Sequence, residues 1–183
     1  MNIAQAKIGS NAIRLGSLLL RRAYGIKPTK TLTTSQVDYL MNNQVAMGIG
    51  KFTPDYKMNL IKWTDWLNIF ETYWGNRSDV FVYATDTDNW DGIWNCDCDN
   101  FAFYFSANMA MVFGINSATT VWGDWIRGKE KIGHYYNIII ALDDNNEPAP
   151  YLYEPMNGKW SKIENKVVKI EDAEYRSKWF IFF

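Results

Sequence analysis

The sequence has few of the residues that cross-link small proteins or bind metals. Its 183 residues include two cysteines, Cys96 and Cys98, and one histidine, His134. A disulfide between residues i and i+2 would be strained and would close almost no loop, so we expect two thiols in a reducing compartment. A zinc site built from Cys96, Cys98 and His134 is also disfavoured, because Cys-x-Cys gives poor ligand spacing and no fourth ligand is evident.

Long apolar runs are also missing near the start of the chain. The longest run there, Leu18 to Leu20, is followed at once by Arg21 and Arg22. This run is too short to span a membrane, and its charges follow it in the wrong order for a secretory signal. We therefore expect no signal peptide and no transmembrane segment, and a cytoplasmic or virion-associated protein.

The distribution of charge argues against one class of function. Residues 1–37 carry six basic residues and no acidic one, so the remainder carries −7 against a total net charge of −1. Such an acidic body is not expected to bind nucleic acid. Residues 1–50 are predicted to be a helical extension whose basic helix covers the core or docks onto a partner or an anionic surface.

Apolar residues are plentiful, and their spacing predicts helices first and strands afterwards. Hydrophobic residues make up 48% of the chain and aromatic residues 16%, which is ample for a core in which most large rings are buried. Helices are predicted over residues 2–23, 34–47, 54–74 and 98–113, and strands over 80–83, 119–125, 134–142, 150–154, 167–170 and 179–183. This order predicts an α+β fold with its main domain over residues 51–183.

Cys98 is the best candidate for a nucleophile. It lies in the segment 97–102 (Asp-Cys-Asp-Asn-Phe-Ala), at the first turn of a predicted helix. Unpaired N–H groups and the helix dipole there favour a thiolate, which is the form that attacks an acyl carbon. A free cysteine is usually a small buried hydrophobe, but two flanking carboxylates argue against that role. The Cys98 N–H would be the first oxyanion donor, with the indole of Trp90 or Trp94 as the second.

His134 and Glu154 are the candidates for a base and its orienting group. His134 opens a hydrophobic strand, and it is the chain's single histidine. A lone histidine is more often structural, yet thiol chemistry with a histidine base has no other candidate here. Glu154 ends the next predicted strand and can fix the tautomer of the ring, with Asn157 as a reserve.

These segments resemble a known family. The segment 97–102 resembles the nucleophile motif of bacterial transglutaminase-like cysteine peptidases (Asp-Cys-acid-acid-aromatic-Ala), with Asn100 in place of the second acid. His134 followed by Asn137 is similar to the His-aromatic-x-Asn strand of the same superfamily. Glu154 with the proline after it is similar to the Glu-Pro segment in the papain-like domain of a fungal lectin.

The resemblance covers about residues 60–160. It implies a papain-like, transglutaminase-like core in which the nucleophile helix packs on an antiparallel sheet, with extra N-terminal helices outside it. The implied activity is cleavage of a peptide or isopeptide amide in a protein or peptide substrate, or transfer of its acyl group. A thioacyl intermediate would form on Cys98, with His134 and Glu154 completing the triad.

Two other functions are compatible with the same residues. One is a non-catalytic structural or binding protein that keeps the papain-like fold, for example a component of a viral particle. The other is a cell-wall amidase, because such hydrolases also combine Cys, His and a polar third residue. The complete set of Cys98, His134 and Glu154 favours an enzyme.

Both relatives need calcium, which implies a use for the aspartates around the nucleophile. Five of them fall within 14 residues: Asp86, Asp88, Asp91, Asp97 and Asp99. Hard oxygen ligands at this density suit Ca²⁺, although their spacing is one residue out of register for an EF-hand loop. The alternative is a solvated acidic loop whose aspartates cap the following helix.

Overall fold

The computed structural model describes residues 15–45, 50–52, 57–75, 82–83, 95–166 and 168–182. Part of the predicted first helix, residues 2–14, lies outside these ranges. So do Asp86, Asp88, Asp91, Trp90 and Trp94.

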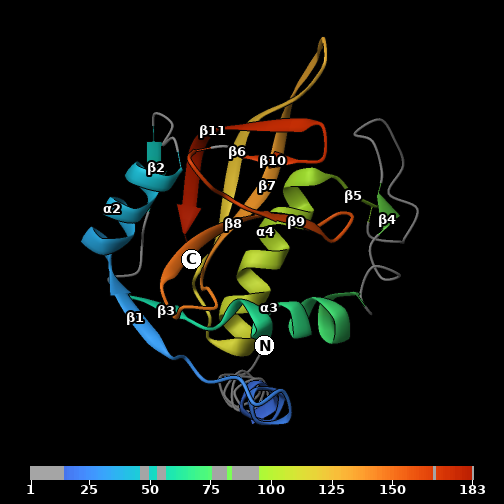
Figure 1. The fold of residues 1–183 in the computed structure, drawn as a ribbon. Helices are drawn as coiled ribbons and strands as arrows, with labels where there is room; N and C mark the ends of the chain where they lie inside the picture. Colours follow the sequence, from blue (N-terminus) through green and yellow to red (C-terminus); the bar gives the residue numbers. More distant parts are fainter. Residues whose placement is uncertain are drawn as a thin grey trace.

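A seven-stranded sheet organises the fold (Figure 1). Its strands are β2 (Gly50–Phe52), β6 (Ala118–Arg127), β7 (Glu130–Leu142), β8 (Pro148–Glu154), β9 (Lys159–Lys162), β10 (Lys169–Ile170) and β11 (Ala173–Phe182). They run in the order β10-β11-β6-β7-β8-β9, and β2 pairs with β11. All neighbours are antiparallel except β2 and β11, which are parallel.

The helices pack around this sheet. They are α2 (Thr34–Gln44), α3 (Trp63–Ile69) with its π-helical continuation η1 (Phe70–Trp74), and α4 (Cys98–Asn108) with its continuation η3 (Met109–Phe113). Residues 15–23 are helical as well. Two small sheets pair β1 (Lys30–Thr33) with β3 (Lys57–Leu60) and β4 (Val82–Tyr83) with β5 (Asn95–Cys96). Helices on a largely antiparallel sheet confirm the predicted α+β class.

The predicted helix over residues 54–74 is wrong in its first part. Residues 57–60 form β3, and the helix begins only at Trp63. Met58 and Leu60 are buried, whereas Lys57 is exposed and Asn59 is half-buried, which is the period of two that a half-buried strand shows. The backbone N–H of Asn59 donates to Asn116 Oδ1 (2.8 Å). The tertiary partner of this segment therefore overrides the helical spacing of its apolar residues.

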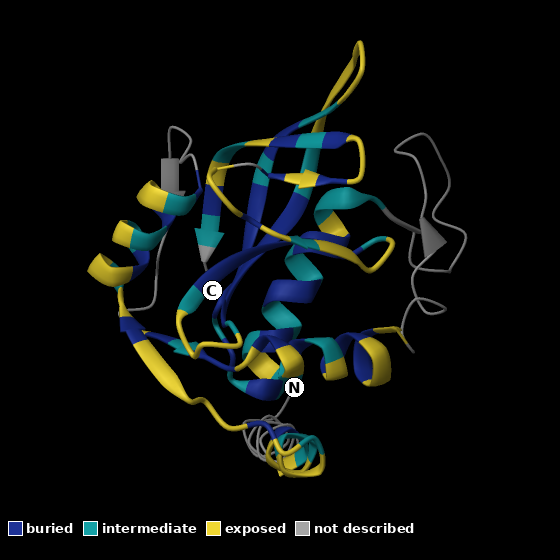
Figure 2. Cartoon of the chain, viewed as in Figure 1, coloured by how far each residue is buried: buried dark blue, intermediate teal, exposed yellow. Residues whose placement is uncertain are grey.

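Each face of the sheet carries its own core. On one face, α3 and α4 bury large rings such as Phe105 against Ile139 and Tyr153. On the other face, Val37 and Met41 of α2 pack with residues of the central strands. Figure 2 shows burial concentrated in these strands and along α4, while the tip of the β6–β7 hairpin is exposed. The nucleophile helix is thus seated on a sheet that is supported from both sides.

The ends of the predicted helix 98–113 match the structure. Asp97 is the N-cap, and its side chain and that of Asn100 form a reciprocal capping box. At the other end, Gly114 has a left-handed backbone (φ 64°), which glycine adopts at no steric cost. Capping at Asp97 fixes Cys98 as the first helical residue.

The basic N-terminal segment is attached to the body by polar and aromatic contacts. Ser17 Oγ donates to the Met111 carbonyl (3.1 Å), and the Tyr24 ring packs edge-on against Phe113. Across the described ranges, no helix has the length and apolar character needed to cross a membrane. The division of the chain at residue 50 stays a prediction.

Candidate active site

Cys98 occupies the first turn of α4. Its side chain is partly buried, and its thiol is free. The first N–H groups of a helix lack intrahelical partners, so this position is electropositive. From this position the thiol can interact with a side chain carried by a strand of the sheet.

His134 and Glu154 meet across the β7–β8 pair. The registered part of this pair begins at Asn137 opposite Tyr153, and Glu154 is the next residue of β8. His134 Nε2 lies 2.6 Å from Glu154 Oε2. Their side chains are only 12% and 4% exposed, respectively. A short contact between an imidazole and a carboxylate in such a dry setting fixes both the orientation and the tautomer of the ring.

The same imidazole is hydrogen-bonded to Cys98. Because Nε2 is occupied by Glu154, Nδ1 is the ring nitrogen left for the sulfur. Burial lowers the pKa of His134, but the hydrogen bonds with Cys98 and Glu154 and their charges outweigh burial and raise it from 6.5 to about 9. The ring is therefore protonated at neutral pH.

Glu154 is held in place on both its side chain and its backbone. Tyr175 Oη donates to Oε2 (3.4 Å), and the Met156 N–H donates to Oε1 (3.4 Å). The Glu154 carbonyl accepts from the N–H of Gly158 (2.9 Å) in the following turn. Asn157, the reserve candidate, instead uses its Oδ1 to accept from the Lys159 N–H (2.9 Å). Of the two candidates, the structure brings Glu154 to His134.

A buried polar network fixes α4 to the sheet beside these residues. Asn137 Nδ2 donates to the Ala102 carbonyl (3.0 Å) and lies 2.8 Å from Ser106 Oγ. Thr120 Oγ1 of β6 donates to the same carbonyl (3.1 Å). Asn137 is three residues from His134, and Ala102 is one helical turn from Cys98. The network therefore sets the distance between the strand that carries the imidazole and the helix that carries the thiol.

Gly123 is required opposite His134. The two residues are register partners in the β6–β7 pair. On its other side, a Cβ atom at Gly123 would collide with the backbone carbonyl of Arg176 in β11. Glycine thus permits close approach of β11 to β6, which also brings Tyr175 to Glu154.

A cavity of about 630 Å³ adjoins the site. It is lined by residues of α3, η1, α4, the end of β8 and the turn after it: Leu67, Phe70, Glu71, Trp74, Gly75, Phe101, Tyr153, Pro155, Met156, Asn157, Gly158 and Trp160. Phe101 lies one turn after Cys98 on α4, and Tyr153 and Pro155 flank Glu154 in sequence. The cavity is therefore bordered by α4 and β8, the helix and the strand that carry Cys98 and Glu154.

Asp97 and Asp99, the two described members of the candidate calcium set, have structural roles at the start of α4. The calcium hypothesis itself stays a prediction, because the other three aspartates of the set lie outside the described residues. Asp97 caps α4, and Asp99 Oδ1 accepts from the Asn100 N–H (2.6 Å). In the part of the chain that the structure describes, no group of at least three His, Cys, Asp or Glu side chains could hold a metal. The helix-capping alternative accounts for both of these carboxylates.

Sequence reasoning missed three supports of the site: Tyr175, Thr120 and Gly123. Thr120 acts through a contact with α4, and Tyr175 and Gly123 act through contacts with other strands, so no local pattern marks them. Asn137 was noted only through the family motif, and its role in joining α4 to the sheet was not foreseen. A polar residue on the inward side of an apolar strand is the signal that could have found it.

Side chains from α4, β7 and β8 thus meet in the order thiol, imidazole and carboxylate. No family model matches the chain, and no curated protein matches it. What the site can do is therefore inferred from the chemistry of its own residues. A thiol at a helix start, a charged imidazole and an orienting carboxylate together suit nucleophilic attack on an acyl group.

Proposed function

We propose that the chain is a thiol hydrolase of the transglutaminase-like, papain-like type. It cleaves a peptide or isopeptide amide, or transfers the acyl group, through Cys98, His134 and Glu154. The observation that carries this proposal is the position of His134, which bonds Glu154 through Nε2 at 2.6 Å and is also hydrogen-bonded to Cys98. A base that contacts both a nucleophile and an orienting group is the geometry that acyl transfer requires.

The first half of the reaction forms the thioacyl intermediate. The imidazolium of His134 and the start of α4 favour the thiolate of Cys98. Its sulfur attacks the amide carbonyl carbon, and a C–S bond forms as the carbonyl oxygen becomes an oxyanion near the Cys98 N–H. When the C–N bond breaks, Nδ1 of His134 gives its proton to the leaving amine. With a pKa of about 9, His134 holds that proton at neutral pH.

The second half of the reaction releases the acyl group. The neutral imidazole removes a proton from water, and the resulting hydroxide attacks the thioester carbon. The C–S bond breaks, and the thiolate–imidazolium pair is restored. An amine in place of water gives acyl transfer with the same proton movements. Glu154 keeps the ring in position and stabilises its charged form through both halves.

A non-catalytic protein with the same fold remains the rival function. Such a protein has no need for a buried carboxylate on its histidine, because an unreactive thiol does not depend on ring orientation. A cell-wall amide would undergo the same two half-reactions, so the choice of amide is a question of substrate. The reactivity of Cys98 separates the enzyme from its rival.

The test is alkylation by stoichiometric iodoacetamide at pH 6, followed by mass spectrometry. At this pH a free thiol is almost fully protonated and unreactive, so fast labelling reports a stabilised thiolate. We expect Cys98 to be labelled before Cys96, and His134→Ala to slow the labelling at least tenfold. Asn157→Ala is the matched control, because this exposed amide does not contact His134. Labelling of Cys98 no faster than free cysteine, or preferential labelling of Cys96, would contradict the proposed function.

A further inference from the structure

The cavity beside the triad has walls that suit a long aliphatic side chain. Phe70 stacks on Tyr153 with ring centroids 4.1 Å apart, and Trp74 donates its indole N–H to the Pro155 carbonyl (3.2 Å). These contacts hold the aromatic rings rigidly. Trp160 is 42% exposed at the rim, where its ring packs edge-on against Trp63. Methylene groups that pack against these rings from the cavity would lose their contact with water.

One charged side chain lies among the described residues that line the cavity. It is Glu71. Within the described residues, no cation pairs with the Glu71 carboxylate, which is exposed. Lys159, which follows the lining residue Gly158, is already paired with Glu171 (2.7 Å). A carboxylate without a counter-ion at the edge of an aromatic cavity favours a cationic ligand.

Other residues reinforce this preference. Asp97 and Asp99 flank Cys98 at the start of α4. An acidic substrate side chain would be repelled here, and a short neutral one would leave the rings in contact with water.

We propose that this cavity binds the side chain of a lysine or arginine in the substrate, next to the amide that is cleaved. The aliphatic stem lies between the aromatic rings, and the cationic head lies at Glu71 and over the face of Trp160. That the bound peptide is then cleaved rests on the proposed function; that the cavity prefers a cationic side chain does not.

Equilibrium binding to the Cys98→Ala protein tests the inference without any reaction. The probes are acetyl-Gly-X-Gly-amide peptides in which X is lysine, norleucine or glutamate, titrated while the tryptophan indole signals are followed by NMR. We expect the lysine peptide to bind roughly three- to tenfold more tightly than the norleucine peptide, and the glutamate peptide most weakly. The indole signals of Trp74 and Trp160, assigned by Trp→Phe substitution, should shift.

Glu71→Gln should remove the difference between lysine and norleucine, and Glu71→Asp should restore part of it. Glu164→Gln is the matched control, since this exposed glutamate does not line the cavity. Equal or tighter binding of norleucine, or shifts confined to other tryptophans, would overturn the inference. Lysine-selective binding by a protein whose Cys98 is not alkylated would keep the inference and overturn the proposed function. Fast alkylation of Cys98 without lysine-selective binding would support the proposed function and overturn the inference about the cavity.

Discussion

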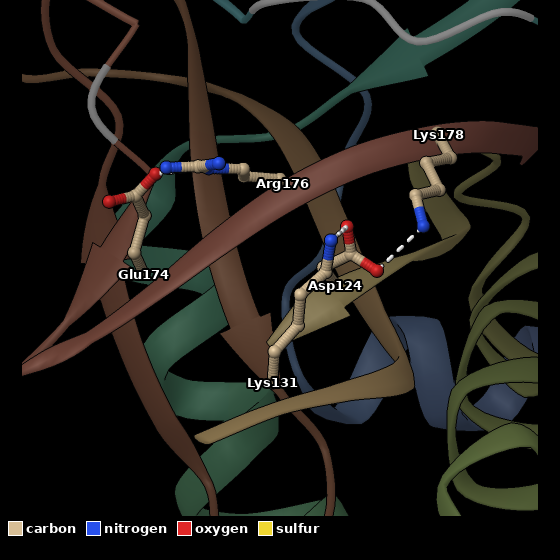
Figure 3. Close-up of polar contacts among 5 residues, drawn as sticks. All are labelled: Asp124, Lys131, Glu174, Arg176 and Lys178. Atoms are coloured by element: carbon tan, nitrogen blue, oxygen red, sulfur yellow. Dashed lines mark hydrogen bonds and ion pairs between the residues drawn. The ribbon is translucent and has the colours of Figure 1, made fainter. Parts of the chain in front are cut away.

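Two buried carboxylates of the sheet each lie 2.6 Å from a basic nitrogen, but their partners differ in exposure. Glu154 contacts His134, and both side chains are nearly inaccessible to water. Asp124 of β6 contacts Lys178 at 2.6 Å and Lys131 at 3.1 Å, and these lysine side chains are 36% and 58% exposed. Figure 3 shows Asp124 between the two lysines.

The two clusters differ in the direction in which the pKa of their central group is shifted. The hydrogen bond from Lys178 lowers the pKa of Asp124, so this carboxylate stays ionised at neutral pH. The pKa of the His134 imidazole is instead raised to about 9, and the ring interacts with a thiol as well as a carboxylate. A short ion pair alone is therefore a poor marker of a reactive site. Burial combined with a group that titrates is a better one.

The largest effect should follow from Glu154→Gln. The amide keeps the size of the side chain but removes the charge that holds His134 in its protonated form. We expect turnover, or Cys98 alkylation while no substrate is known, to fall on the order of 10- to 1000-fold. In a plot of the Cys98 alkylation rate against pH, the alkaline limb should also move from about pH 9 toward lower pH. An unchanged profile, together with a shifted one in Asn157→Ala, would assign the orienting role to Asn157.

Asn137→Ala should produce the next largest effect, on stability as well as reactivity. It removes three buried hydrogen bonds of Asn137 Nδ2, with the Ala102 carbonyl, the Thr119 carbonyl and Ser106 Oγ. We expect a loss of about 2 to 4 kcal/mol in the free energy of unfolding, measured with urea. Cys98 alkylation should slow too, because α4 loses its fixed position against β7. A loss of stability with wild-type alkylation would show that this network does not position the nucleophile.

The pH dependence of stability should reveal the triad in the folded state. The folded pKa of His134, about 9, is above its ordinary value of 6.5. The protonated ring therefore contributes its full stabilisation to the folded state below about pH 6.5, and this stabilisation is lost as the pH rises to about 9. The loss amounts to at most about 3 kcal/mol. Urea unfolding across this range should show the fall in the wild type and a smaller one in Glu154→Gln. A flat dependence in the wild type would contradict the shifted pKa.

The Asp124 cluster, whose two lysines are exposed, should give the smallest effect. Lys131→Met and Lys178→Met each remove one ammonium group, and water already screens both. We expect a small change in melting temperature that diminishes further in 1 M NaCl, and no change in Cys98 alkylation. An effect on alkylation as large as that of Glu154→Gln would remove the distinction between the two clusters.

The parts of the site that follow from local sequence were predictable. Capping at Asp97, helical spacing after Cys98 and the apolar strand after His134 mark the right elements, and Glu154 ends its strand as expected. The false helix at residues 57–60 and the unpredicted strands β1 and β9 depend on pairing with distant segments. So do the cavity and the contact from Tyr175 to Glu154, because both exist only where separate strands and turns converge. The spacing of apolar residues predicts which side chains are buried. It does not predict which distant segment packs against them, and these features depend on that segment.

The titration of His134 by NMR tests the central claim most directly. Since the chain has one histidine, its ring signals need no assignment among several. The account predicts a midpoint at about pH 9 in the wild type and a lower midpoint in both Cys98→Ala and Glu154→Gln, because each removes one of the two partners of the ring. A wild-type midpoint close to the ordinary value of 6.5, unmoved by either substitution, would show that the thiol, imidazole and carboxylate do not act as one unit.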